Sequence, residues 1–120
     1  MNKYLFLTVT NTDVGKTFIG TKLIKDFNKK YNYLAFKPIE TGCRKKGGKL
    51  IPEDSSKYHG ILSKVMTLDE LNPFRFIPPV SPYLAIKRAR KKVFIKDYYK
   101  KLKIISKDVP VLIEGAGGAF

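Results

Sequence analysis

The chain has 120 residues, of which 24 are Lys or Arg and 10 are Asp or Glu, so its formal net charge is +14. This length allows one domain, spanning residues 1–120, with a modest core, and it excludes a second domain. The single cysteine excludes an internal disulfide, and no apolar run is long enough to cross a bilayer. We therefore expect a cytoplasmic protein without a membrane partner.

A candidate phosphate-binding loop follows the first apolar run. Residues 3–9 predict a strand, and the junction after it reads Gly15-Lys16-Thr17. Residues 16–29 predict a helix whose apolar face is formed by Ile19, Leu23 and Phe27. In such a loop, backbone N–H groups surround phosphate oxygens, the lysine reaches the β and γ phosphates, and the threonine hydroxyl holds Mg²⁺. The residues predicted to bind the ATP phosphates are Asp13, Val14, Gly15, Lys16 and Thr17. Thr10 stands where the strict motif has glycine, so a plain helix start is the alternative.

A second strand is predicted over residues 33–38, and it completes a βαβ unit with two parallel strands. Residues 39–54 are polar and contain three glycines, which predicts a long loop at the carboxyl edge of the sheet. Asp54 is placed to cap a short helix that runs toward Leu62. These features predict an α/β fold with a site at this edge.

Two further helices and a third strand are predicted in the remainder of the chain. Ser81 is a candidate N-cap with Pro82 at the first helical position, and a second helix is predicted over residues 95–106. Residues 109–114 predict a buried strand that ends in Glu114. A carboxylate at this place is typical of a Walker B acid, which holds Mg²⁺ or orders its waters.

The positive charge is concentrated in residues 87–107, which contain ten basic residues and one acidic residue. Such a segment is either a solvated face or a surface that binds nucleic acid. Only two of the ten are arginines, whose planar guanidinium groups read bases and phosphates. The pattern favours a solvated face, and we expect no nucleic-acid partner.

Several motifs occur together in an order that resembles the dethiobiotin synthetase family over the whole chain. They are Thr10-Asn11-Thr12-Asp13-Val14-Gly15-Lys16-Thr17, Lys37-Pro38-Ile39-Glu40-Thr41-Gly42, Asp54, Ser81-Pro82 and Glu114-Gly115-Ala116-Gly117-Gly118. The resemblance implies a P-loop NTPase-like, doubly wound parallel sheet. It also implies ATP-dependent ureido ring closure of 7,8-diaminononanoate with carbon dioxide to give dethiobiotin, in a Mg²⁺-dependent homodimer.

The family's functional residues can be carried over position by position. The resemblance implies that Lys16 stabilises the γ-phosphoryl group and that Thr12 and Lys37 lie near the carbamate formed from carbon dioxide. It implies three Mg²⁺ ligands, Thr17, Asp54 and Glu114. It also places Thr41 and Ser81 beside the diamine substrate. For Asp54, Thr41 and Ser81, a helix cap or an ordinary loop hydroxyl is the alternative, and for Lys37 it is a strand end with a solvated ammonium.

The chain departs from the family pattern in two ways. Val9 stands where the family usually has glycine and Asn11 where it has aspartate, which affects how the loop can surround a phosphate. Family members also continue for about as many residues again after the Gly-rich loop. We therefore expect the chain to be the amino-terminal part of the fold, with the carboxyl-terminal part absent, and to be inactive and poorly soluble alone.

Two other classes of function remain open from the sequence. Cobyrinate synthases and partitioning ATPases also begin with a P-loop on a doubly wound sheet. A partitioning ATPase usually has a second lysine early in the loop, and residues 10–12 contain none. The other alternative is a basic nucleic-acid-binding module built on residues 87–107.

Overall fold

The computed structural model describes residues 4–7, 13–27, 33–106 and 109–115. The centre of these ranges is a parallel sheet in the order β1 (Tyr4–Leu7), β7 (Val111–Glu114), β2 (Leu34–Phe36). The predicted parallel arrangement of the first two strands is confirmed, but β7 lies between them. All four residues of β7 are buried, as expected for the middle strand of a parallel sheet.

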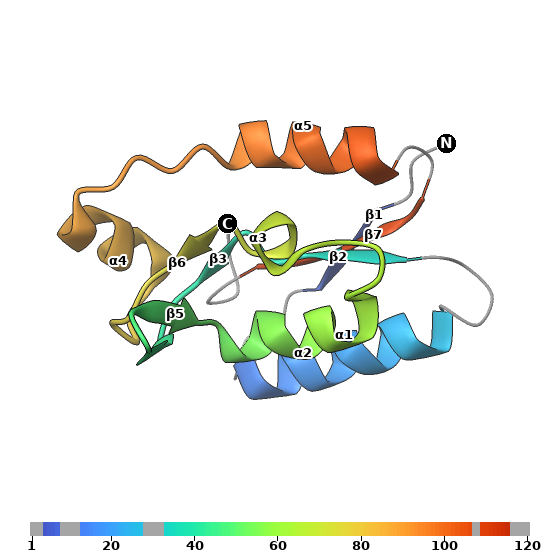
Figure 1. Ribbon diagram of the computed structural model, residues 1–120, viewed down its shortest axis with the longest axis horizontal. Helices are drawn as coiled ribbons and strands as arrows, with labels where there is room; N and C mark the ends of the chain where they lie inside the picture. Colours follow the sequence, from blue (N-terminus) through green and yellow to red (C-terminus); the bar gives the residue numbers. More distant parts are fainter. Residues whose placement is uncertain (1–3, 8–12, 28–32, 107–108, 116–120) are drawn as a thin grey trace.

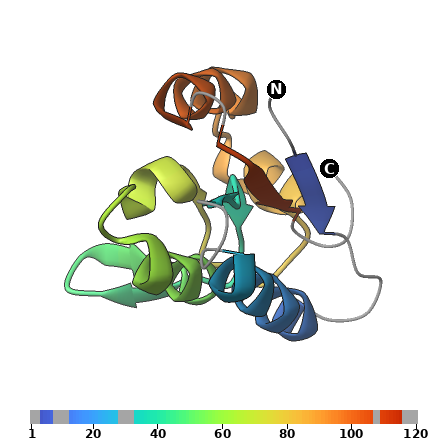
Figure 2. The same ribbon diagram turned by 90° about the vertical axis from the view of Figure 1, so that its right-hand side faces the viewer.

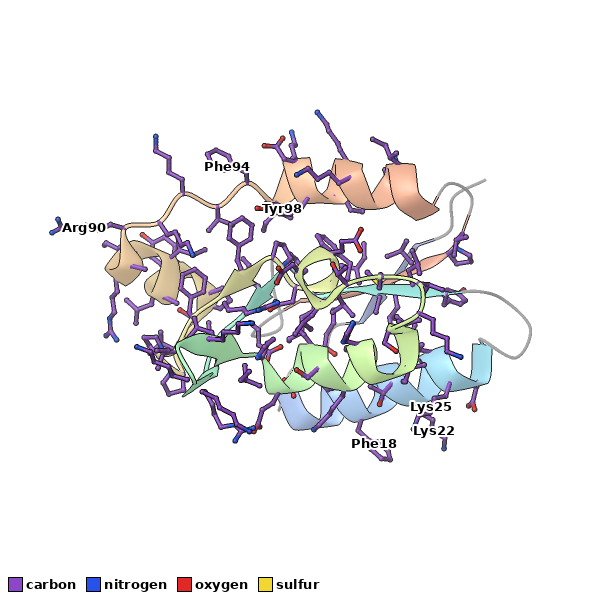
Figure 3. The ribbon with its side chains drawn as sticks, viewed as in Figure 1. Phe18, Lys22, Lys25, Arg90, Phe94 and Tyr98 are labelled. Carbon is purple, nitrogen blue, oxygen red and sulfur yellow. The ribbon has the colours of Figure 1, made fainter. Side chains whose placement is uncertain are left out.

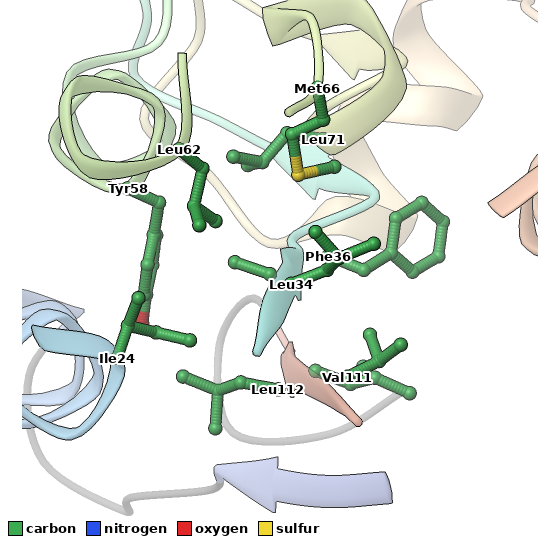
Figure 4. Packing of buried hydrophobic residues seen from close by; sticks show 11 residues of the cluster. Ile24, Leu34, Phe36, Tyr58, Leu62, Met66, Leu71, Val111 and Leu112 are labelled. Atoms are coloured by element: carbon green, nitrogen blue, oxygen red, sulfur yellow. The ribbon is translucent and has the colours of Figure 1, made fainter. Parts of the chain in front are cut away.

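Helices cover both faces of this sheet. Figures 1 and 2 show α1 (Asp13–Phe27) and α2 (Glu53–Leu62) on one face and α5 (Ile95–Ser106) on the other. The core between α1, α2 and the sheet contains Ile24, Tyr58 and Leu112, each at most 1% exposed (Figure 4). This layered α/β arrangement is the one that the sequence predicts.

Helix α1 differs from the prediction at its start and in its buried face. The helix already includes Asp13, three residues before the predicted start. The predicted apolar face contained Ile19, which is 44% exposed, whereas Thr17 and Ile24 are fully buried. Figure 3 shows Phe18 and Lys22 on the outer side of α1.

Residues 39–54, predicted as a loop, contain three short strands and the start of α2. Strand β3 (Ile39–Glu40) pairs in parallel with β6 (Phe74–Arg75), and β4 (Arg44–Lys46) pairs with β5 (Lys49–Ile51) as a hairpin. The hairpin turn is Gly47-Gly48, with φ of 57° and 80°. Two glycines with positive φ match the right-handed twist of the flanking strands, which explains why a polar, glycine-bearing stretch forms a hairpin.

The remaining helices are α3 (Leu68–Leu71) and α4 (Pro82–Ala89). Helix α3, which the sequence analysis did not predict, begins with a capping box between Thr67 and Glu70. Helix α5 is held by Tyr98, whose ring meets Phe74 edge-on at a centroid distance of 5.1 Å. None of the helices in the described ranges combines the length and apolar character that crossing a bilayer requires.

Candidate functional site

The candidate site lies where β2 and β7 end beside the start of α1. In the parallel register Phe36 pairs with Ile113, so the next residues of the two strands, Lys37 and Glu114, lie side by side. The Lys37 Nζ donates to Glu114 Oε2 at 2.7 Å. The strand ends therefore place one ammonium and one carboxylate at the edge where ligands bind in open α/β sheets.

Two hydroxyl groups complete the surroundings of the Glu114 carboxylate. The Thr17 Oγ1 lies 3.3 Å from Oε1 and 3.2 Å from Oε2, and the Tyr58 hydroxyl donates to Oε1 at 2.6 Å. The donors come from α1, α2 and the end of β2. Three separate elements therefore fix one carboxylate, which we call the Glu114 cluster (Thr17, Lys37, Tyr58 and Glu114).

The Glu114 cluster is almost inaccessible to solvent. Lys37, Tyr58 and Glu114 are each 1% exposed, and Thr17 is fully buried. Burial by itself would lower the pKa of Lys37, but the charge and hydrogen bond of Glu114, with the charges of Glu40 and Asp54, raise that pKa above its usual value. The ammonium is thus charged at neutral pH, and it compensates a carboxylate whose burial would otherwise be costly.

Asp54 lies in the first turn of α2, near these charges. Burial, the Glu40 carboxylate and the Glu114 carboxylate raise the pKa of Asp54, and Lys37 opposes them. Among the described residues, no group donates a hydrogen bond to the Asp54 side chain. The predicted capping role of Asp54 is wrong, because α2 begins one residue earlier, at Glu53, with Pro52 at the N-cap.

Helix α2 is capped instead by a carboxylate from another element. Pro52 has no side chain that can accept a hydrogen bond, and Glu40, at the end of β3, takes its place. Its carboxylate accepts from the backbone N–H of Asp54 at 3.0 Å and of Ser55 at 2.9 Å, and from the Ser55 hydroxyl at 2.6 Å. The Glu40 carboxylate thereby links β3, which follows Lys37 in the chain, to the first turn of α2, which contains Asp54.

The other predicted site residues are less closely connected to the Glu114 cluster. Ser81 is the N-cap of α4 and accepts from the Leu84 N–H at 3.3 Å, so its structural role is confirmed. Thr41 is half-buried. Within the described ranges, neither hydroxyl is hydrogen-bonded to Lys37 or Glu114.

The residues predicted to bind phosphate are described only in part. Asp13, Val14, Gly15 and Lys16 belong to the first turns of α1, directly before Thr17. Thr12, Val9 and Asn11 lie outside the described residues, as does the Gly-rich sequence after Gly115. The structure thus places the backbone of Gly15-Lys16-Thr17 at the amino end of a helix, where a phosphate is favoured electrostatically.

The donor set suits Mg²⁺ bound together with phosphates. The described residues contain no group of three or more His, Cys, Asp or Glu side chains that could hold a metal by themselves. Mg²⁺ takes oxygen ligands, and it usually combines one or two carboxylates with waters and substrate phosphates. Thr17, Asp54 and Glu114 offer such oxygens.

Sequence reasoning missed two residues of this region, Tyr58 and Glu40. Tyr58 lies four residues after Asp54, hence on the same face of α2, and that spacing was the available signal. Glu40 stands in the Lys-Pro-Ile-Glu-Thr-Gly motif, and the signal for its role was a proline at the N-cap position of a helix. Both roles depend on contacts between residues distant in the sequence.

Comparison with known proteins gives one family and a consistent set of relatives. The family model described as an AAA domain matches residues 3–119. An ATP-dependent dethiobiotin synthetase of Fusobacterium nucleatum is 37% identical over 98% of this chain and 53% of its own length. The same named enzyme from Aeromonas salmonicida is 33% identical (100% of this chain, 54% of its own), and that from Aquifex aeolicus is 36% identical (95% and 50%).

The resemblance predicted from the motifs is therefore confirmed. These matches do not favour a cobyrinate synthase, a partitioning ATPase or a nucleic-acid-binding module. The chain spans about half the length of the curated relatives it matches.

Proposed function

The chain belongs to the AAA domain family, and from that premise we propose that it takes part in ATP-dependent dethiobiotin synthesis. The reaction is ureido ring closure of 7,8-diaminononanoate with carbon dioxide, with release of ADP and phosphate. The observation that carries the proposal is the Glu114 cluster, which holds an ammonium, a carboxylate and a hydroxyl beside the Gly15-Lys16-Thr17 turn.

The reaction needs positioning and neutralisation of charge more than a nucleophilic side chain. One substrate amine takes up carbon dioxide, loses a proton and becomes a carbamate. A carbamate oxygen attacks the γ-phosphorus of ATP and ADP leaves. The second amine then attacks the carbamate carbon of this mixed anhydride, and phosphate leaves as the ring closes.

We assign Lys16 and Lys37 to the anionic groups in this sequence. Lys16 follows Gly15 in the first turns of α1 and would contact the γ-phosphoryl group. Lys37 is a charged ammonium whose observed partner is Glu114, and it would transfer its hydrogen bond to the carbamate or the transferred phosphoryl group. Thr12 is assigned to the carbamate as well, and Thr41 and Ser81 to the diamine.

Thr17, Asp54 and Glu114 would hold Mg²⁺, which when bound neutralises charge on the ATP phosphates. Lys37 now donates to Glu114 Oε2, so a cation at that oxygen would compete with the ammonium. Burial, the largest cause, raises the pKa of Asp54, so a cation there would compete with a proton up to a higher pH than at an exposed aspartate.

We also propose that the protein acts in the cytoplasm as a homodimer on small molecules, without a nucleic-acid or membrane partner. The family resemblance supports the dimer. The single cysteine of the chain, which cannot form an internal disulfide, supports a reducing compartment.

The test is product identification. The full-length natural protein that contains this sequence is incubated with Mg·ATP, bicarbonate and 7,8-diaminononanoate, and dethiobiotin is measured by mass spectrometry. We expect product only when all three substrates are present, and none from Lys16→Ala. ATP hydrolysis that is indifferent to the diamine, without dethiobiotin, would contradict the proposal.

A further inference from the structure

The Tyr58 hydroxyl is held rigidly against Glu114. The side chain is 1% exposed, and its ring belongs to the core cluster with Ile24 and Leu62. Figure 4 shows the ring extending from α2 toward α1 with its oxygen next to Ile24. Close packing of the ring fixes where the hydroxyl lies, and the hydroxyl donates to Glu114 Oε1 at 2.6 Å.

The two oxygens of Glu114 differ in their closest partners. Oε1 accepts from Tyr58 at 2.6 Å and Oε2 from Lys37 at 2.7 Å, whereas the Thr17 hydroxyl lies almost equally far from both, at 3.3 and 3.2 Å. Under the proposed function Lys37 and Thr17 turn to the phosphates, the carbamate or the cation. Of the described donors to Glu114, Tyr58 alone has no part in that chemistry.

We propose that Tyr58 is the positioning residue of Glu114: its hydroxyl holds Oε1 while Oε2 exchanges the Lys37 ammonium for the metal ion. This inference rests on the proposed function. Carboxylates that bind metals are commonly oriented by a hydrogen bond from a second residue, and loss of that partner lowers metal affinity.

The protonation state of Tyr58 agrees with this role. Burial, followed by the charge and hydrogen bond of Glu114, raises the pKa of the Tyr58 hydroxyl far above its usual value. The hydroxyl therefore keeps its proton and remains a donor at neutral pH.

The test measures how ADP binding depends on Mg²⁺. ADP is titrated calorimetrically into the protein at a series of fixed free Mg²⁺ concentrations, for wild type and for Tyr58→Phe, which keeps the ring. We expect the Mg²⁺ concentration for half-maximal ADP binding to rise roughly 10- to 100-fold in the variant. Tyr83→Phe is the matched control, because Tyr83 is 73% exposed on α4, and it should not change that concentration.

A double-mutant cycle separates positioning from a general packing effect. If Tyr58 acts through Glu114, Tyr58→Phe should have no further effect on the Mg²⁺ dependence in a Glu114→Gln background. A packing effect would instead weaken ADP binding equally with and without Mg²⁺. Each variant is first tested for cooperative thermal unfolding, and the same stabilising osmolyte is added to all samples if one variant unfolds near the assay temperature.

Failure of this inference and failure of the proposed function would give different results. A Tyr58→Phe protein with the Mg²⁺ dependence of wild type would overturn this inference and leave the proposed function intact. A wild-type protein that binds no ADP in the presence of Mg²⁺ would overturn the proposed function, and this inference with it.

Discussion

Lysine occurs in two contrasting surroundings in this protein. Lys37 is buried, and its ammonium is paired with Glu114 at 2.7 Å. The segment of residues 87–107 contains ten basic residues. Those of the ten that the structure describes are all exposed, on α4, on α5 and on the chain between them. In Figure 3, Arg90 points away from the body of the molecule, whereas Tyr98 faces inward from α5.

The contrast shows that the number of charges does not locate the functional site. Exposed lysines are hydrated, and some of those in this segment lie over aromatic rings, as Lys101 does over Tyr98 at 5.3 Å. A buried lysine persists only where a carboxylate and hydrogen bonds compensate it. The buried pair therefore marks the candidate site, although its two charges cancel and add nothing to the net charge of +14.

The largest expected effect comes from removing the buried ammonium. Lys37→Met leaves Glu114 without its cation, and breaking a buried pair in this way costs about 3–5 kcal/mol of the free energy of unfolding. Lys100→Met, at an exposed position of α5, should change that free energy by less than about 0.5 kcal/mol. Urea unfolding followed by circular dichroism measures both. Equal losses of unfolding free energy in the two variants would contradict the distinction between the buried and the exposed lysines.

The comparison of wild type with Lys37→Met also gives a prediction about the pH dependence of stability. Because the folded-state pKa of Lys37 is raised, its contribution to stability is complete below the unfolded-state value of about 10.4 and is lost as pH rises through the folded value. The difference in unfolding free energy between wild type and Lys37→Met should therefore stay constant between about pH 7 and pH 9. A difference that shrinks steadily over this range would mean that Lys37 loses its proton between pH 7 and pH 9. Its pKa in the folded state would then be lowered, not raised.

The two helix caps allow a second comparison between the regions. Glu40 caps α2 with three hydrogen bonds from within the protein, whereas Ser81 caps α4 with one bond of 3.3 Å at an exposed position. We expect Glu40→Ala to cost about 2 kcal/mol and Ser81→Ala about 0.5 kcal/mol of unfolding free energy. Chemical denaturation of the two variants measures this, and a larger loss at Ser81 would refute the role given to Glu40.

The smallest expected effect concerns the lysine-rich segment. Lys96 and Lys100 are exposed and four residues apart on α5, so they repel each other, and replacing both with glutamine should stabilise the protein by about 0.3 kcal/mol at low salt. Salt screens exposed charges, so this gain should vanish at about 1 M ionic strength. The effect of Lys37→Met should hardly change with salt. Unfolding curves at two salt concentrations measure both.

The central part of the fold and of the site was predictable because its signals are local. Three apolar runs predict buried parallel strands, and the polar residue after each run falls at the same sheet edge. Glu114 was found in this way, whereas the role of Lys37 was implied only by the resemblance to the family. Their direct contact follows from the parallel register, once β7 lies beside β2.

The rest depends on contacts between segments that are distant in sequence. The β3–β6 pairing involves two residues in each strand, which is too short to leave a pattern. Glu40 caps a helix 13 residues further along the chain, and Tyr58 donates to a carboxylate 56 residues away. The Gly47-Gly48 hairpin was the exception, since its turn signal was visible and was assigned to a loop.

The most direct measurement compares the two groups of lysines in the proposed reaction. Phosphate release from Mg·ATP is followed in the full-length natural protein that contains this sequence, with carbon dioxide present and with and without 7,8-diaminononanoate. The proteins compared are wild type, Lys37→Met and Lys96→Gln/Lys100→Gln. We predict that diamine-dependent release falls roughly 100- to 1,000-fold in Lys37→Met and is unchanged in the double variant. Diamine-dependent release that survives in Lys37→Met but is lost in the double variant would contradict the account.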